Sequence, residues 1–113
     1  MEELMPLHDA AEVDDVVTIR RLVAEGADVN VQGPEGVRPL HMAAGHGHVD
    51  AVCVLVEVGA DLEAPSVHGS TPLHQAAGRG HVAVVKTLIE LGADKEASAA
   101  DGSTPLHAAA YHG

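Results

Sequence analysis

Histidines are the residues of this 113-residue chain with the clearest capacity for metal chemistry: there are nine, and three lie in HMAAGHGH, residues 41–48. Imidazole nitrogen is a common zinc ligand. His48 and His81, however, are 33 residues apart in similar segments, and helices packed side by side are separated by about 8–10 Å. Two ligands of one zinc ion must each lie about 2.0–2.1 Å from it. No cysteine or carboxylate cluster completes a site, so we expect structural or surface histidines and no bound metal.

The candidate nucleophiles also lack the partner residues that catalysis needs. Cys53 is the single cysteine, and it stands between two valines at a position equivalent to Lys86, which indicates an outward-facing thiol. No paired base is evident near it, and the serines lie in segments typical of loops, without a Ser/His/Asp arrangement; these are Ser66, Ser70, Ser98 and Ser103. We therefore expect no enzyme activity and no cofactor. One cysteine cannot form an internal disulfide, which favours a reducing intracellular compartment. We expect the cytoplasm, with the nucleus as the alternative.

The elements that carry these residues repeat every 33 residues. Pro-Leu-His occurs at 6–8, 39–41, 72–74 and 105–107, and Gly-Ala-Asp occurs at 26–28, 59–61 and 92–94. We expect a single domain over residues 1–113, with repeats 1–32, 33–65 and 66–98 and a partial repeat 99–113. The chain is 46% hydrophobic but has one Tyr and no Phe or Trp, so its core must be built from small aliphatic side chains.

The third repeat predicts two helices. Thr71 is a good N-cap and Pro72 suits the first helical position, while Gly78 and Gly80 end this first helix after about two turns. A second helix carries an apolar stripe that ends at Gly92 and that we expect to be buried between stacked units. The stripe consists of Val82, Val85, Leu88 and Ile89, matched by Val49, Val52, Leu55 and Val56, and by Val16, Ile19, Leu22 and Val23. The segments between pairs indicate extended loops or hairpins.

In its period, in Thr-Pro-Leu-His-x-Ala-Ala, in Gly-His and in Gly-Ala-Asp, the whole chain resembles the ankyrin repeat family. The resemblance implies an all-α ankyrin-repeat solenoid of stacked antiparallel helix pairs with projecting β-hairpin loops. It also implies protein–protein recognition through a concave face made of hairpin tips and first helices. A docking or regulatory ankyrin module of a larger enzyme, channel or signalling protein is the open alternative, and catalysis by this segment is a third class.

The resemblance also implies which positions contact a partner, since the family's variable positions carry over. They are Glu2, Leu4 and Glu12 in the first repeat, Pro34, Glu35, Val37, Gly45 and His46 in the second, Val67, His68, Ser70, Gly78 and Arg79 in the third, and Asp101, Ser103, Tyr111 and His112 in the partial fourth.

The resemblance further implies that the threonine and histidine of each motif bond to each other, as Thr71 with His74 and Thr104 with His107. Met5 and Arg38 replace this threonine, so their helices lose a cap worth about 1 kcal/mol, and His8 and His41 lose the hydroxyl partner. Asn30, eight residues after Leu22, resembles the asparagine that a hydroxylase modifies in other ankyrin segments. The competing interpretation is a loop asparagine that bonds locally.

The net charge of the chain indicates the surface charge of its partner. The net charge is −11, and it falls mainly on residues 1–32, at −6, and 33–65, at −4. We therefore expect no nucleic acid and no membrane as partner, but a protein that is basic or neutral where it meets the first two repeats. The partial fourth repeat lacks a second helix to cover Leu106, Ala109 and Ala110, which predicts a fragment of a longer repeat protein. We expect its C-terminal end to be either frayed or covered by another molecule through self-association; the alternative is that the short helix docks on the third repeat and is a sufficient cap by itself.

Overall fold

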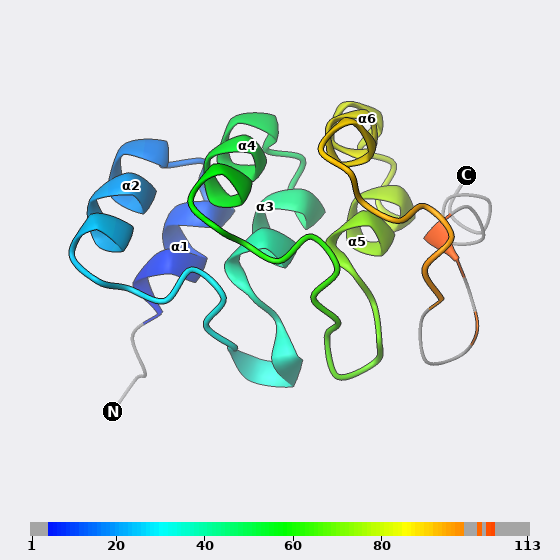
Figure 1. The fold of residues 1–113 in the computed structure, drawn as a ribbon, viewed down its shortest axis with the longest axis horizontal. Helices are drawn as coiled ribbons and strands as arrows, with labels where there is room; N and C mark the ends of the chain where they lie inside the picture. The colour runs from blue at the N-terminus through cyan, green and yellow to red at the C-terminus, as the bar shows by residue number, and fades with distance from the viewer. Residues whose placement is uncertain (1–4, 99–101, 103, 106–113) are drawn as a thin grey trace.

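The computed structural model describes residues 5–98, 102, 104 and 105. Its helices are α1 (Pro6–Glu12), α2 (Val16–Ala24), α3 (Pro39–Gly45), α4 (Val49–Glu57), α5 (Pro72–Gly78) and α6 (Val82–Glu90), with a short 3-10 turn η1 (Pro34–Gly36) before α3. Helices α1, α3 and α5 form one row and α2, α4 and α6 a second row beside it (Figure 1). The described part is therefore the all-α stack of helix pairs that the 33-residue period predicts.

The first helix of each pair starts where the sequence indicates, at a proline preceded by the cap position. The Thr71 hydroxyl accepts a hydrogen bond from the His74 N–H at 3.4 Å and lies 2.8 Å from His74 Nδ1. As predicted, Met5 and Arg38 offer no side-chain cap. The Arg38 N–H still donates to His41 Nδ1 at 3.0 Å, so the histidine half of the motif persists without the hydroxyl.

The core consists of small aliphatic side chains in layers between the helices. Its largest fully buried members are Ile19, Leu40, Leu55, Leu73, Leu88, Val52 and Val84, and alanines of the first-row helices fill the space between them. Alanine lets neighbouring helices approach closely, which is why a chain with almost no aromatic residues packs a continuous core.

The predicted burial of the apolar stripe on α6 is confirmed only in part. Leu88 is fully buried, but Val82 and Ile89 are 63% and 41% exposed, and Val84, which the stripe omits, is fully buried. Val82, Val85 and Ile89 line a pocket of about 630 Å³ at the end of the stack. The described residues hold no further helix pair on that side, so the expectation of burial is wrong for Val82 and Ile89. Self-association through the partial repeat stays a prediction, because residues 106–113 lie outside the described part.

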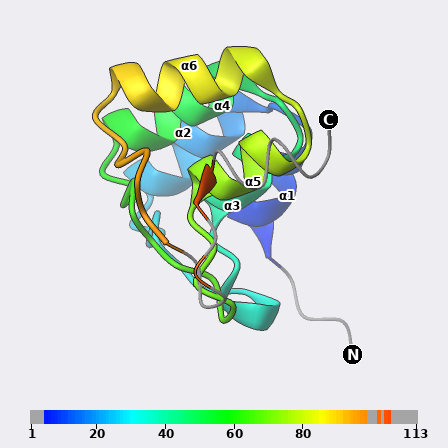
Figure 2. The same ribbon diagram turned by 90° about the vertical axis from the view of Figure 1, so that its right-hand side faces the viewer.

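The loops between pairs project beyond the first row of helices, as Figure 2 shows from the end of the stack. One backbone hydrogen bond closes each of the first two loops, from the Gly33 N–H to the Val37 carbonyl at 2.7 Å and from the Ser66 N–H to the Ser70 carbonyl at 2.9 Å. A further bond of 2.7 Å joins the loops, from the Val67 N–H to the Glu35 carbonyl. The expected hairpins are thus closed loops, and no strand is present among the residues that the structure describes.

Candidate protein-binding surface

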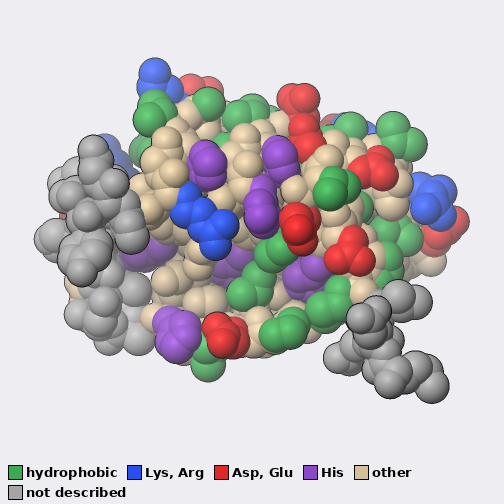
Figure 3. All heavy atoms as spheres, turned by 180° about the vertical axis from the view of Figure 1, so that it is seen from behind, with side chains coloured by type: hydrophobic (Ala, Val, Ile, Leu, Met, Phe, Trp, Pro, Cys, Tyr) green, Lys and Arg blue, Asp and Glu red, His purple; other side chains and the backbone are tan. Residues whose placement is uncertain are grey.

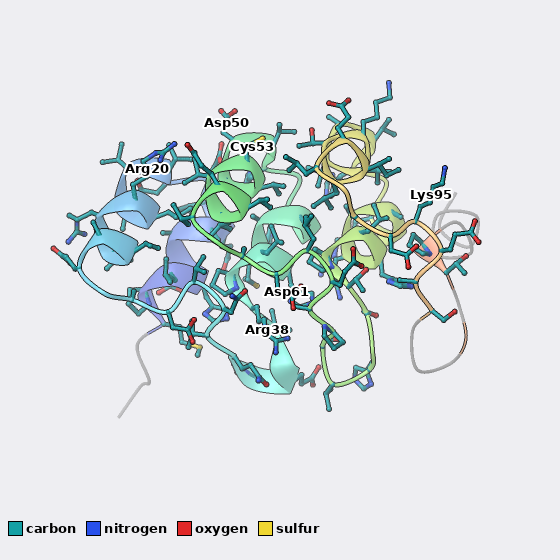
Figure 4. The ribbon with its side chains drawn as sticks, in the orientation of Figure 1. Arg20, Arg38, Asp50, Cys53, Asp61 and Lys95 are labelled. Atoms are coloured by element: carbon teal, nitrogen blue, oxygen red, sulfur yellow. The ribbon has the colours of Figure 1, made fainter. Side chains whose placement is uncertain are left out.

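Helices α1, α3 and α5 and the projecting loops lie on one side of the second row of helices, and we call this side, with the ends of the first-row helices, the inner face (Figures 1 and 2). Seen from behind, the molecule shows acidic, histidine and Lys or Arg side chains in neighbouring patches (Figure 3). The opposite row, α2, α4 and α6, forms the outer face, where Figure 4 shows Asp50 and Cys53 on α4. The exposed thiol of Cys53 therefore lies on the outer face, as its equivalence to Lys86 indicates.

The first group of predicted contact residues lies where the first-row helices end. Glu12 ends α1, Gly45 ends α3 with His46 next to it, and Gly78 ends α5 with Arg79 next to it. The Arg79 guanidinium donates to the Gly45 carbonyl at 3.3 Å. The structure therefore brings these residues together from three repeats. Gly45 itself is buried, so it shapes this surface through its backbone.

Two histidines fix the spacing within this group. His48 Nε2 donates to the Glu12 carbonyl at 2.7 Å, and His81 Nε2 donates to the Gly45 carbonyl at 3.0 Å. Each bond crosses from one repeat to the preceding one. The helix ends are consequently held in register by bonds at equivalent positions, and both histidines have the structural role that the sequence indicates.

The second group of predicted contact residues lies in the loops. The carbonyls of Val37 and Ser70 face inward, where they accept hydrogen bonds from His8 Nε2 at 2.7 Å and from His41 Nε2 at 3.0 Å. The exposed tips consist of Pro34, Glu35, Val67 and His68. A carboxylate oxygen of Glu35 lies 3.9 Å from His68 Nε2, with both side chains largely exposed, so this pair contributes little by itself.

The other predicted contact residues fall outside the described part of the chain. They are Glu2, Leu4, Asp101, Ser103, Tyr111 and His112, and the same holds for His107, the expected partner of Thr104. Their roles stay predictions.

His41 is a buried histidine whose pKa departs from its ordinary value. Burial lowers its pKa, and the hydrogen bonds with the Ser70 and Ala64 backbones oppose this effect, while the charges of Arg38 and His8 lower the pKa further. The ring is therefore neutral at neutral pH. In that state one ring nitrogen donates and the other accepts, which matches its bonds to Ser70 and Arg38.

We expect His41 to make the protein less stable in mild acid. Because its pKa is lower in the folded state than its ordinary value of 6.5, the unfolded chain binds the proton more readily, and stability falls as pH drops below about 7 towards the folded pKa. Urea unfolding of the wild type and of H41Q at several pH values checks this. The stability advantage of the wild type over H41Q should shrink as pH falls, and an advantage that stays constant would contradict the assignment.

Several contacts that sequence reasoning missed also join the repeats. The Asp14 carboxylate accepts a hydrogen bond from the Ala51 N–H at 3.0 Å. The side chain of Asn30 spans to the next repeat, where it donates to the Gly59 carbonyl at 3.2 Å and accepts from the Asp61 N–H at 2.8 Å. Asn30 is thus more than a locally bonded loop residue, and its hydroxylation stays a hypothesis. The 33-residue register pairs Asn30 with Glu63, which accepts from the Asp94 N–H at 2.7 Å, but an amide and a carboxylate do not indicate a shared role by sequence alone.

Two other kinds of site are absent from the described residues. Among the described residues, no group of three or more His, Cys, Asp or Glu side chains is placed to hold a metal ion. In the same part of the chain, no helix is long and apolar enough to span a membrane.

A search of curated proteins found no match to the chain. The family model of ankyrin repeats in three copies matches residues 7–99 and 65–113. The chain therefore belongs to the ankyrin repeat family.

Proposed function

We propose that this protein binds a partner protein through its inner face. Ankyrin repeats are generally protein–protein interaction modules. The observation that carries the proposal is the organisation of the inner face, where helix ends from three repeats are held in register by His48, His81 and Arg79. A surface fixed in advance loses little conformational freedom on binding, so more of the contact energy appears as affinity. The same surface would serve a free-standing scaffold or a docking module within a larger enzyme, channel or signalling protein.

The acidic part of this face supports a proposal about the charge of the partner. Glu12 and Glu35 are exposed on the first two repeats, and these repeats carry most of the net negative charge. Complementary charge raises the rate of association more than it raises affinity. The proposed partner therefore has a basic or neutral surface where it meets the first two repeats.

Charge reversal tests this proposal. A partner is first captured with the wild-type protein in a pull-down and identified by mass spectrometry. The triple variant E2K/E12K/E35K should then bind it with an association rate lower by about tenfold or more at low salt, and with a weaker salt dependence. Stopped-flow or surface-based kinetics measures both quantities.

The matched control is E25K/D50K/E90K, which changes the net charge equally on side chains outside the inner face. Glu25, Asp50 and Glu90 are all exposed. If the control slows association as much as the test variant, the effect is one of total charge. If it slows association more, the outer face is the binding surface and the proposal is wrong.

A further inference from the structure

The electrostatic character of the inner face reverses from one end of the stack to the other. Asp9 and Glu12 are exposed on α1 at one end, and Arg79 is exposed after α5. In the middle of Figure 3, histidines lie between a group of acidic side chains and a Lys or Arg side chain, while further acidic and basic side chains lie towards the edges of the view. Among the described residues, Arg79 has no carboxylate within ion-pair distance, although the chain has 17 acidic residues and only 6 basic ones.

Arg79 is held in place by backbone rather than by an acid. Its guanidinium donates one hydrogen bond to the Gly45 carbonyl, which His81 also binds. A side-chain atom added at Gly45 would lie 3.7 Å from the Arg79 Cζ and Nη1 atoms, so the guanidinium extends across the bare glycine backbone. An arginine has five N–H donors, and this single bond leaves the others available at the surface.

His81 shares the Gly45 carbonyl with Arg79, and His46 directly follows Gly45 in the chain. The rings of His46 and His48 are stacked, with centroids 6.2 Å apart and an interplanar angle of 15°. His48 is fixed through its bond to the Glu12 carbonyl, while His46 is exposed directly after Gly45. We call Arg79, His46, His48 and His81 the arginine–histidine cluster. His48 and His81 already donate their Nε2–H groups to backbone carbonyls, so the donors that the cluster offers at the surface belong to the exposed Arg79 and His46. They stand on a protein whose net charge is −11.

We infer that the arginine–histidine cluster binds an anionic group, a carboxylate or a phosphate, carried by a segment of the protein partner. The planar guanidinium matches the two oxygens of such a group, and the bond to Gly45 fixes its position. This inference rests on the proposed function. It also predicts the direction in which the partner segment lies on the face. A segment with its anionic group over α5 and its basic residues over α1 is complementary along the whole face, whereas the reversed segment is repelled at both ends.

Short peptides test the cluster without a known partner. The ¹⁵N-labelled protein is titrated with blocked tetraglutamate, with a blocked phosphoserine peptide and with blocked tetraglycine, and NMR shifts are followed for backbone and arginine N–H groups. Both anionic peptides should shift Gly45, His46, Arg79 and His81 in a saturable way, and tetraglycine should not. The tighter of the two anionic peptides identifies the favoured group. In R79Q the affinity should fall by about two- to fivefold, as for an exposed ion pair.

The matched control is K86Q, which removes an exposed cation from α6. Affinity unchanged in K86Q but reduced in R79Q supports the cluster. Equal losses in both variants, no loss in R79Q, or no saturable shift at the cluster would overturn the inference. With a captured partner the two proposals also separate, because slower association of the acidic triple variant with unaltered binding of R79Q would leave the proposed function intact and refute the anion site.

Discussion

Replacing Leu55 by alanine is expected to lower the free energy of unfolding by about 2–5 kcal/mol. Leu55 is fully buried in α4, and α4 packs against both α2 and α6. The substitution removes apolar contacts and leaves a cavity that rigid neighbouring helices cannot fill. Since domains of this kind are stable by only about 5–15 kcal/mol, urea unfolding followed by circular dichroism should show a large shift of the midpoint.

The repeat itself supplies the control. Leu22 occupies the same position in α2, where it is only partly buried, so L22A should cost clearly less than L55A. In a stack whose stability is a sum of repeat and interface terms, a cavity in the central repeat weakens the interfaces on both of its sides. Equal losses in L22A and L55A would show that the neighbouring repeats contribute little to the burial energy of the central one.

The second large effect is expected for Gly47→Ala. Gly47 has φ of +78°, and an added Cβ would lie 2.7 Å from His81 Nδ1 and 3.0 Å from Cε1 of the same ring. The left-handed backbone alone costs about 1–2 kcal/mol for a residue with a side chain, and the ring must also move. His81 would then lose its bond to the Gly45 carbonyl. Unfolding measurements give the stability loss, and NMR shifts at Gly45 and Arg79 report the displacement of the ring.

Gly80→Ala separates the two contributions. Gly80 has a similar φ of +76°, and a Cβ there would meet nothing within 4 Å. G47A should therefore destabilise the protein more than G80A, and H81A should abolish most of this difference when combined with G47A. Asp14 holds the equivalent position in the first repeat at φ of 60°, where the bond from the Ala51 N–H to its carboxylate offsets the strain. If G47A costs no more than G80A, the contact with His81 is not significant.

Local sequence signals predicted the helices well because their causes lie within a few residues. Thr71 and Pro72 mark a helix start through local bonds and a fixed φ, and the left-handed Gly80 lies just beyond the end of α5. The burial of Val82 and Ile89 was predicted wrongly because it depends on what packs beside α6, which the amphipathic pattern does not contain.

The candidate surface was predictable as a set of positions rather than as a set of contacts. The 33-residue register places Gly45 and Gly78 at equivalent helix ends, but it does not state that the Arg79 side chain extends back to the Gly45 carbonyl of the preceding repeat. That direction depends on the spacing of α3 and α5. Asn30 and Glu63 share a register position, yet an amide and a carboxylate would not be recognised as equivalent until both are seen to accept a bond from the next repeat.

The bonds between repeats have a consequence for variation of the loops. At the Val37 and Ser70 positions the accepting atom is a main-chain carbonyl, which every amino acid carries. The identity of the loop residue can therefore change without loss of the bond that couples neighbouring repeats. Randomising these side chains in a library should yield many folded members with different surfaces, whereas randomising His8 and His41 should yield few. The architecture thus separates the atoms that maintain the stack from those that can diversify its recognition.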